Sequence, residues 1–287
     1  MSRIPSLNIL LESAGHDYLQ ELYGQVIENV QHNTISTTLK NMNLSGDPQS
    51  GSVEAKRFVN STAQIYGTAR AAGAGVAVKA RPVVVQIDQD KEIVEEIEYK
   101  DTILYGVDGL LARRSADHAR TMVRNLEEAF FLEAADKADM TITAGATILE
   151  TVESAIQQVE TVRNNFVNGI PRDMLAIIAT PYIYGQLRNF LDTNVRNAHI
   201  QVDIESVNTF HGVRIWSSIY LPPTAGMIVM AEGSVALPVM SRPYTAEKIP
   251  LSEAYAVELY YYYGVKAVTP DLIAVMNGGN GGDGGNG

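Results

Sequence analysis

The sequence predicts an α+β protein organised around one long helix, and three observations support this prediction. Residues 115–139 contain neither proline nor glycine, and their apolar side chains recur at spacings of three and four. The segments 53–104 and 233–276 are rich in β-branched and aromatic residues, which is typical of strands. Between the helix and the last strands, residues 142–232 alternate strand-like and helix-like patterns, which indicates a compact α/β unit.

Residues 1–52 are expected to form an N-terminal arm that carries one amphipathic helix. The helical pattern covers residues 16–40, and turn chemistry follows at Gly46, Pro48 and Gly51. The apolar side chains on one face of this helix are Leu19, Leu22, Tyr23, Val26, Ile27 and Val30.

Residues 53–104 predict two long strand regions joined by a flexible turn near Gly73 and Gly75. A long hairpin is only marginally stable alone in water, and its strand edges invite pairing with another chain. A protruding hairpin would therefore indicate an oligomeric assembly. The alternative is a hairpin folded onto the sheet of its own domain.

Charge is segregated along this region. Residues 55–81 carry basic side chains and no acid, whereas residues 88–101 are strongly acidic. Opposite charges of this kind steer association and fix register, so we expect the two stretches to meet between subunits. The candidate interface residues are Arg70, Lys79 and Arg81 on the basic side, and Glu92, Glu95, Glu96, Glu98 and Asp101 on the acidic side.

The long helix is predicted from Ser115 to Asp139. Ser115 can cap its start, and Asp117 lies in the first turn, where the helix dipole favours a negative charge. At about 1.5 Å per residue the helix is roughly 37 Å long, which suits a spine on which other elements pack. Its apolar face consists of Ala119, Met122, Val123, Leu126, Ala129, Phe130 and Ala134.

After the spine, the pattern predicts a helix over residues 147–167, a buried strand over 174–180 and a helix that begins at Pro181. Weaker strand patterns follow at 199–204, 210–218 and 227–234. The strands of 233–276 could pair with those before the spine, which would make that domain discontinuous. The run Tyr260–Tyr263 places two rings on each strand face, as for a core side and an interface side. Residues 277–287 are a Gly-rich tail that we expect to be flexible.

Motifs of ordinary enzyme chemistry are absent from the sequence. It contains no P-loop, no zinc-protease motif and no nucleophile elbow, and its five histidines show no metal-ligand spacing. The acidic cluster from Glu92 to Asp101 is interpreted as a solvated strand face rather than a cation site. No cofactor, metal or catalytic residue is therefore predicted.

Composition limits the partners. The net charge of −11 argues against a dedicated nucleic-acid binder, although a chain that merely encloses nucleic acid is compatible with it. The sequence has no cysteine, no apolar run long enough to span a bilayer and no signal-peptide pattern. We therefore expect no membrane partner.

The order of these parts resembles the major capsid protein of tailed bacteriophages, with its Hong Kong 97-like fold. The passages EEIEYKDTILYGVDGLLARR and GVRIWSSIYLPPTAGMIVMAEGSVALPVM are similar to segments of that family. The resemblance implies an N-terminal arm at 1–52 and, at 53–141, a peripheral domain with an extended loop at about 66–95 and the spine helix. It also implies an axial domain at 142–232 and return strands of the peripheral domain at 233–276.

The resemblance further implies a structural protein of the virion, and not an enzyme. It would assemble in the host cytoplasm, as hexamers and pentamers, into an icosahedral shell around double-stranded DNA, which it would contact non-specifically. A portal is an expected partner, and so is a separate scaffolding protein, because residues 1–52 are too short for a fused scaffolding domain. The alternative is that the chain is a processed form, against which Met1 argues. Some family members form covalent cross-links; apart from Lys79 near the loop tip, nothing here matches that chemistry.

Two alternatives remain open from the sequence. An encapsulin-like compartment shell would share the fold and enclose an enzyme. An oligomeric α+β enzyme would use the acidic cluster in catalysis. Particle size separates a shell from an oligomeric enzyme.

Overall fold

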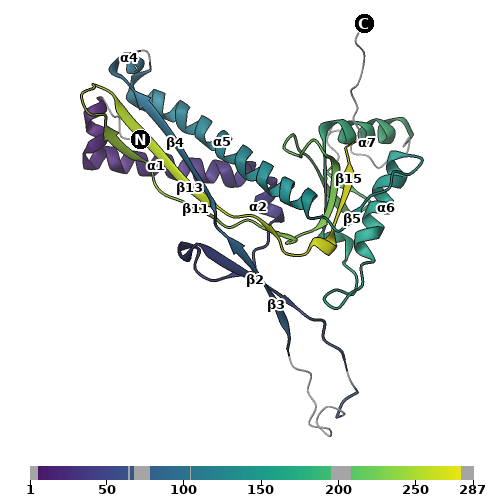
Figure 1. Ribbon diagram of the computed structural model, residues 1–287. Helices are drawn as coiled ribbons and strands as arrows, with labels where there is room; N and C mark the ends of the chain where they lie inside the picture. The colour runs from purple at the N-terminus through teal and green to yellow at the C-terminus, as the bar shows by residue number, and fades with distance from the viewer. Residues whose placement is uncertain (1–5, 64, 68–77, 104, 195–207, 279–287) are drawn as a thin grey trace.

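The structure is a computed structural model, and it describes residues 6–63, 65–67, 78–103, 105–194 and 208–278. The molecule has three parts (Figure 1). A helix–sheet unit surrounds the long helix, an α/β unit lies at the far end of this helix, and a hairpin protrudes between the two units. The predicted α+β class is confirmed by this architecture.

The N-terminal segment packs into the core instead of extending as an arm. It forms η1 (Leu7–Leu11), α1 (Ser13–Asn33) and α2 (Ile35–Leu39). The predicted single helix over 16–40 is wrong at Thr34, whose φ of −101° and ψ of 125° separate α1 from α2. Leu10, Leu19 and Leu39 are at most 1% exposed, so the segment is part of the main hydrophobic core.

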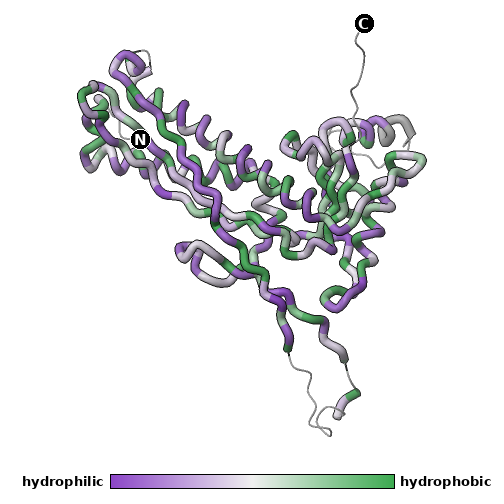
Figure 2. Tube along the Cα trace, in the orientation of Figure 1, coloured by the Kyte–Doolittle hydropathy of each residue, from purple (hydrophilic) through white to green (hydrophobic). Residues whose placement is uncertain are grey.

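The spine is the helix α5 (Gly106–Asp136), which begins nine residues before the predicted start (115 − 106). Ser115 is not a cap: it is buried inside the helix, and its hydroxyl donates to the carbonyl of Ala112 at 2.9 Å. The apolar spacing continues backward through Leu111 and Val107, and both are buried. Along its turns the helix alternates hydrophilic and hydrophobic residues (Figure 2). Of the predicted apolar face, Ala119, Met122, Val123, Leu126, Phe130 and Ala134 are buried, and Ala129 is partly buried.

A four-stranded sheet packs against the spine. β4 (Gln89–Ile97) pairs antiparallel with β13 (Tyr255–Tyr263) along all nine residues, from Tyr255↔Ile97 to Tyr263↔Gln89. This register confirms that strands near the C-terminus pair with a strand before the spine. The other edge of β13 pairs with β11 (Val239–Ser241) and β12 (Thr245–Lys248), and α4 (Tyr99–Thr102) connects β4 toward α5.

The hairpin is formed by β2 (Ser52–Phe58) and β3 (Ala80–Gln86), paired from Ser52↔Gln86 to Phe58↔Ala80. The C-terminal boundary of the extended loop expected over 66–95 is wrong, because β4, which begins at Gln89, belongs to the four-stranded sheet. The turn near Gly73 and Gly75 lies outside the described residues. At the hairpin base lie β1 (Leu44–Ser45) and η2 (Pro48–Ser50).

The α/β unit contains a six-stranded sheet flanked by α6 (Ile148–Glu160) and α7 (Pro181–Asn194). The predicted buried strand and the helix start at Pro181 are confirmed, since all five residues of β6 are buried. A short pair links this unit to the rest, β10 (Val235–Ala236) with β14 (Lys266–Ala267). In sheet order the strands are β5 (Met140–Thr141), β15 (Ile273–Asn277), β9 (Ala225–Ala231), β6 (Leu175–Ala179), β8 (Val213–Ser217) and β7 (Thr209–Phe210).

Two predictions for this part differ from the structure. The helix expected to reach residue 167 ends at Glu160, because the side chain of Asn164 accepts hydrogen bonds from the backbone of Phe166 and Val167 and forms a turn. β15 pairs with β9 and β5, so residues 273–276 lie in the six-stranded sheet and not among the peripheral strands. The strand pattern at 199–204 falls outside the described residues.

Candidate assembly surfaces

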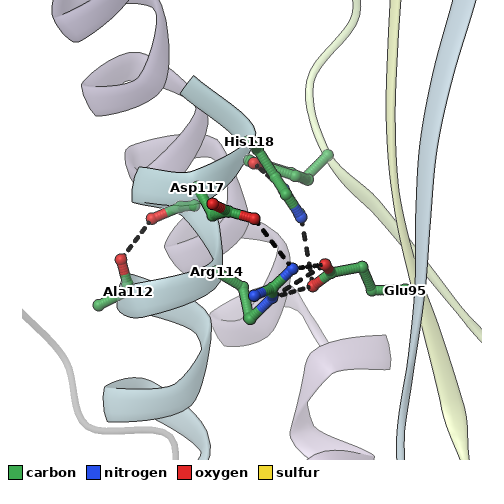
Figure 3. A network of polar contacts seen from close by, with 7 residues as sticks. Glu95, Ala112, Arg114, Asp117 and His118 are labelled. Carbon is green, nitrogen blue, oxygen red and sulfur yellow. Dashed lines mark hydrogen bonds and ion pairs between the residues drawn. The ribbon is translucent and has the colours of Figure 1, made fainter. Parts of the chain in front are cut away.

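A partly buried polar network joins the spine to the four-stranded sheet (Figure 3). Arg114 Nε on α5 donates to the two carboxylate oxygens of Glu95 on β4, at 2.9 and 2.7 Å. One turn further along α5, His118 Nε2 lies 3.2 Å from Glu95 Oε2, and His118 Nδ1 is hydrogen bonded to the hydroxyl of Tyr244 at 2.7 Å. Three segments that are distant in sequence are therefore fixed to one another.

The electrostatics of this network favour an ionised Glu95. Burial alone would raise the pKa of Glu95, but hydrogen bonds from Arg114 and the interaction with His118 outweigh burial and lower it. Burial, followed by the negative charge of Glu95, raises the pKa of Tyr244, which stays a neutral hydroxyl. The cavity beside these groups has a volume of only about 10 Å³. It has no room for a substrate, so the network is structural.

A second set of contacts fixes the base of the hairpin. The guanidinium of Arg57 on β2 pairs with Asp271 and stacks 4.4 Å over the ring of Phe166. The amide of Asn164 also donates to Asp271, and the backbone N–H of Asn60 donates to the carbonyl of Asn165 at 2.9 Å. Burial alone would raise the pKa of Asp271, but the hydrogen bond and charge of Arg57 lower it. These contacts with the α/β unit therefore fix the angle at which the hairpin leaves the rest of the protein.

The four-stranded sheet packs against the helices with one face and leaves the other face open. α1 passes behind its strands in Figure 1, and Leu19 of α1 belongs to the same core cluster as Leu259 and Tyr261 of β13. Along β13, Leu259, Tyr261 and Tyr263 are buried, and the residues between them are partly exposed. We call this surface the open sheet face; it carries Asp90, Glu92, Val94 and Glu96 of β4, Glu247 of β12, and Glu258, Tyr260 and Tyr262 of β13.

Carboxylates surround the tyrosines of the open sheet face. The hydroxyl of Tyr260 donates to Glu258 at 2.9 Å, and this hydrogen bond raises the pKa of Tyr260. The negative charges of Glu92 and Glu247 raise this pKa further, and the registers of β4 and β12 on β13 place both side chains on the same face as the ring. The surface is therefore acidic and aromatic.

The hairpin also has an open face, of different chemistry. Its inner face is buried in a small cluster that includes Val53, Ala55 and Val85. Phe58 is 56% exposed and Val84 is 37% exposed. We call the outer surface the hairpin open face; it carries Glu54, Lys56 and Phe58 of β2, and Ala80, Pro82 and Val84 of β3.

The structure separates the residues predicted for the interface. Lys79 and Arg81 are exposed on the hairpin, Glu92 and Glu96 lie on the open sheet face, and Arg70 falls outside the described residues. Glu95 points to the opposite face and pairs with Arg114 of its own chain.

The last two predicted acids are exposed and have a local role. Glu98 and Asp101 form a capping box at the start of α4, with the N–H of Glu98 donating to Asp101 at 3.0 Å.

Sequence reasoning did not identify which residues gather on the open sheet face. Glu247, Glu258 and Tyr262 lie at least 150 residues after Ile97, the last residue of β4 (247 − 97 = 150). Only the register of β13 on β4 places Tyr260 opposite Glu92 and Glu258 opposite Val94. The period-two alternation of the tyrosine run was the available signal, and it indicated an exposed side without identifying its neighbours.

Among the described residues, no group of three or more His, Asp or Glu side chains could hold a metal ion. Within the same part of the chain, no helix is long and apolar enough to cross a membrane. An open cleft of about 690 Å³ lies beside the hairpin base, where it is lined by Arg81, Asn164 and Lys266.

Comparisons with known proteins give matches among solved structures. No family model and no curated protein sequence matches the chain. The capsid of the cyanophage P-SCSP1u aligns with a TM-score of 0.60 at 15% identity, over 85% of this chain and 88% of that chain. The mature capsid of bacteriophage PhiM1 aligns with a TM-score of 0.56 at 17% identity, over 85% and 87%.

A virus-like particle from Pyrococcus furiosus also matches, with a TM-score of 0.56 at 12% identity, over 91% of this chain and 98% of that chain. These alignments cover most of both chains in each case. The chain therefore has the α+β fold of phage capsid proteins, the Hong Kong 97-like fold that the order of its sequence elements implied.

Proposed function

We propose that this chain is the major capsid protein of a tailed phage and assembles, as hexamers and pentamers, into an icosahedral shell around double-stranded DNA. The observation that carries the proposal is the fold, which aligns with phage capsid chains over 85% or more of each partner. The projecting hairpin supports it, because Phe58 and Val78 are exposed there at 56% and 86%. Large apolar side chains on a protruding element are typical of a contact surface.

The enzyme alternative is less well supported. The acidic residues that it would use lie on an open face or cap a helix, and Glu95 is held by Arg114. Catalytic carboxylates normally lie in a concave site, and the cavity beside Glu95 holds only about 10 Å³. We therefore infer a structural protein without catalytic activity.

A compartment shell that encloses a protein is the second candidate, and the match to the virus-like particle from Pyrococcus furiosus favours including it. Both readings predict closed particles, and they differ in the contents. The proposed partners of the phage shell are a scaffolding protein, a portal and the packaged DNA, which the acidic chain contacts non-specifically.

The proposal is tested by imaging the purified protein and by analysing the particles. Negative-stain electron microscopy is expected to show closed shells hundreds of ångströms across. Particles from infected cells are expected to contain nuclease-protected DNA. A uniform population of dimers or small rings would reject the shell, and shells filled with one cargo enzyme and no DNA would favour the compartment.

A further inference from the structure

The outer face of the spine carries three exposed arginines. Arg113, Arg120 and Arg124 lie on α5 at spacings of seven and four residues, and all three are exposed. Seven residues make about two helical turns and four make about one turn, so the three side chains point to the same side. At about 1.5 Å per residue, their backbone positions lie about 10.5 and 6 Å apart along the helix. We call this row the arginine stripe.

Few negative charges compensate the arginine stripe. Among the residues that the structure describes, no acid forms an ion pair with any of the three guanidiniums. Arg113 lies over the ring of Tyr105, 4.2 Å from its centroid, and Asp117 pairs with Arg114 at 3.2 Å. Glu128, one turn beyond the stripe, lines a separate cleft at the edge of the sheet. The stripe is therefore locally positive, although the whole chain has a net charge of −11.

An open cleft of about 480 Å³ adjoins the arginine stripe between α5 and α1. It is lined by Arg120 of α5, by Asn29 and Asn33 of α1, and by Tyr220, which follows β8. Side-chain amides and tyrosine hydroxyls are common donors to phosphate and sugar oxygens in protein–DNA contacts. The cleft therefore adds neutral hydrogen-bond donors to the positive charge of the stripe.

The arginine stripe and the open sheet face lie on opposite sides of the helix–sheet unit. The side of α5 that faces the sheet carries His118, which bonds to Tyr244, and Asn125, whose amide donates to Tyr261 at 2.6 Å. Arg120 follows two residues after His118, about 200° around the helix, so it points away from the sheet. In a closed shell, two opposite faces of the wall meet different surroundings. The acidic sheet face repels DNA, whereas the arginine stripe attracts it.

We propose that the arginine stripe and the adjoining cleft bind the phosphate backbone of the packaged double-stranded DNA. This inference rests on the proposed function and assigns the DNA contact to named side chains. DNA carries a negative charge about every 3.4 Å along each strand, so guanidiniums about 6 and 10.5 Å apart reach separate phosphates at once. A weak contact in each copy is sufficient, because the stripe repeats in every copy of the shell.

The surroundings of the spine exclude recognition of a base sequence. A major groove about 12 Å wide admits one helix. α5 is flanked by the four-stranded sheet and by α1, where the hydroxyl of Tyr18 donates to the carbonyl of Asp108 at 3.1 Å. The spine therefore cannot enter the groove, and its arginines contact the DNA backbone from outside, whatever the sequence.

The first experiment is photo-cross-linking in DNA-filled particles, which suits this chain because it has no cysteine. Ala116→Cys keeps all three arginines and places a probe between Arg113 and Arg120, and Glu247→Cys on the open sheet face is the matched control. Both variants would be labelled with a benzophenone maleimide and irradiated, and the DNA bound per labelled chain would be compared. We expect about tenfold more DNA at Ala116, because the acidic sheet face repels DNA. Equal amounts at both positions, or a cross-link from Ala116 to an acidic protein in place of DNA, would overturn the inference.

The second experiment measures how salt weakens the binding of the unassembled chain to a short DNA duplex. Arg120→Gln with Arg124→Gln should lower the slope of log K against log salt by about 1.8, because each phosphate contact contributes about 0.9. Arg120→Lys with Arg124→Lys should keep the parent slope, since lysine also neutralises phosphate. Lys56→Gln with Lys79→Gln removes the same charge from exposed positions on the hairpin, and this matched control should also keep the parent slope.

The results separate the DNA contact from the proposed function. Variants would be compared at equal amounts of folded chain, checked by circular dichroism. An equal loss of slope in the arginine-to-glutamine variant and the hairpin control, or no binding by the parent chain at low salt, would overturn the stripe as the DNA site. DNA-filled particles without a DNA cross-link at Ala116 would also overturn it and leave the proposed function intact. Particles that contain no DNA would instead refute the proposed function.

Discussion

Replacing Phe130 by alanine tests whether the spine is the centre of the hydrophobic core. Phe130 is 0% exposed, and its ring lies edge-on against Phe131, with centroids 5.5 Å apart and planes at 84°. Removing a buried phenylalanine side chain costs about 3–5 kcal/mol, part of which is the aromatic pair of about 0.5–1.5 kcal/mol. At about 2–4 °C per kcal/mol, we expect the unfolding midpoint to fall by on the order of 10 °C.

The matched control is Leu132→Ala, two residues further along the same helix. Leu132 is 57% exposed, and leucine and alanine have similar helix propensities, so its midpoint should change by less than about 2 °C. Differential scanning calorimetry would compare both variants with the parent in the same assembly state, because assembly itself raises apparent stability. Equal midpoints for the Phe130 and Leu132 variants would refute the assignment of the buried helix face.

Three further predictions concern the polar contacts. Glu95→Gln should lower the free energy of unfolding above about pH 4.5 and weaken its loss in acid, because the pKa of Glu95 is lowered from 4.5 and the stabilisation by this carboxylate is lost as pH falls through the lowered pKa. Urea unfolding at a series of pH values would measure both effects, and a loss of stability in acid equal to that of the parent would contradict the prediction. Burial raises the pKa of Glu127, so its ionised carboxylate destabilises the folded protein more at pH 7.5 than at pH 4. Glu127→Gln, which can still accept from the Ser36 N–H, should therefore raise the unfolding midpoint more at pH 7.5 than at pH 4, and a lower midpoint at pH 7.5 would reject this prediction. A double-mutant cycle of Arg57→Ala and Asp271→Ala should give a coupling of about 0.5–3 kcal/mol, and strict additivity would mean that their pair does not stabilise the hairpin base.

Local sequence patterns predicted those elements whose buried faces follow from the spacing of their own apolar residues. The buried face of α5 follows from spacings of three and four, and the continuous apolar run of β6 follows from burial on both sides. The predicted start of α5 was too late because it was placed at Ser115, where a stretch without glycine and proline begins, although Val107 and Leu111 continue the apolar face before it. At Gly106, φ is +70°, so this glycine makes a turn, and the helix begins there.

Features that depend on pairing between distant segments could not be predicted in the same way. The sequence cannot show that Glu95 faces Arg114, because one residue of register decides which side chains of β4 point inward. Five carboxylates in the same stretch therefore looked equivalent. The spacing of Arg114 and His118, one helical turn apart, was a partial signal that this helix face is polar at its start.

The fixed angle of the hairpin bears on the proposed shell. Arg57 and Asp271 hold the hairpin base to the α/β unit, and Glu95 and Arg114 hold β4 to the spine. The hairpin and the four-stranded sheet are therefore held in one orientation along the path through β3 and β4. When copies assemble through elements that are held in this way, their orientation sets the rotation from one copy to the next. A variant that loosens the hairpin base, such as Asp271→Ala, should therefore still form shells and broaden the distribution of particle diameters. Electron micrographs would measure this distribution, and a diameter spread equal to that of the parent would contradict the argument.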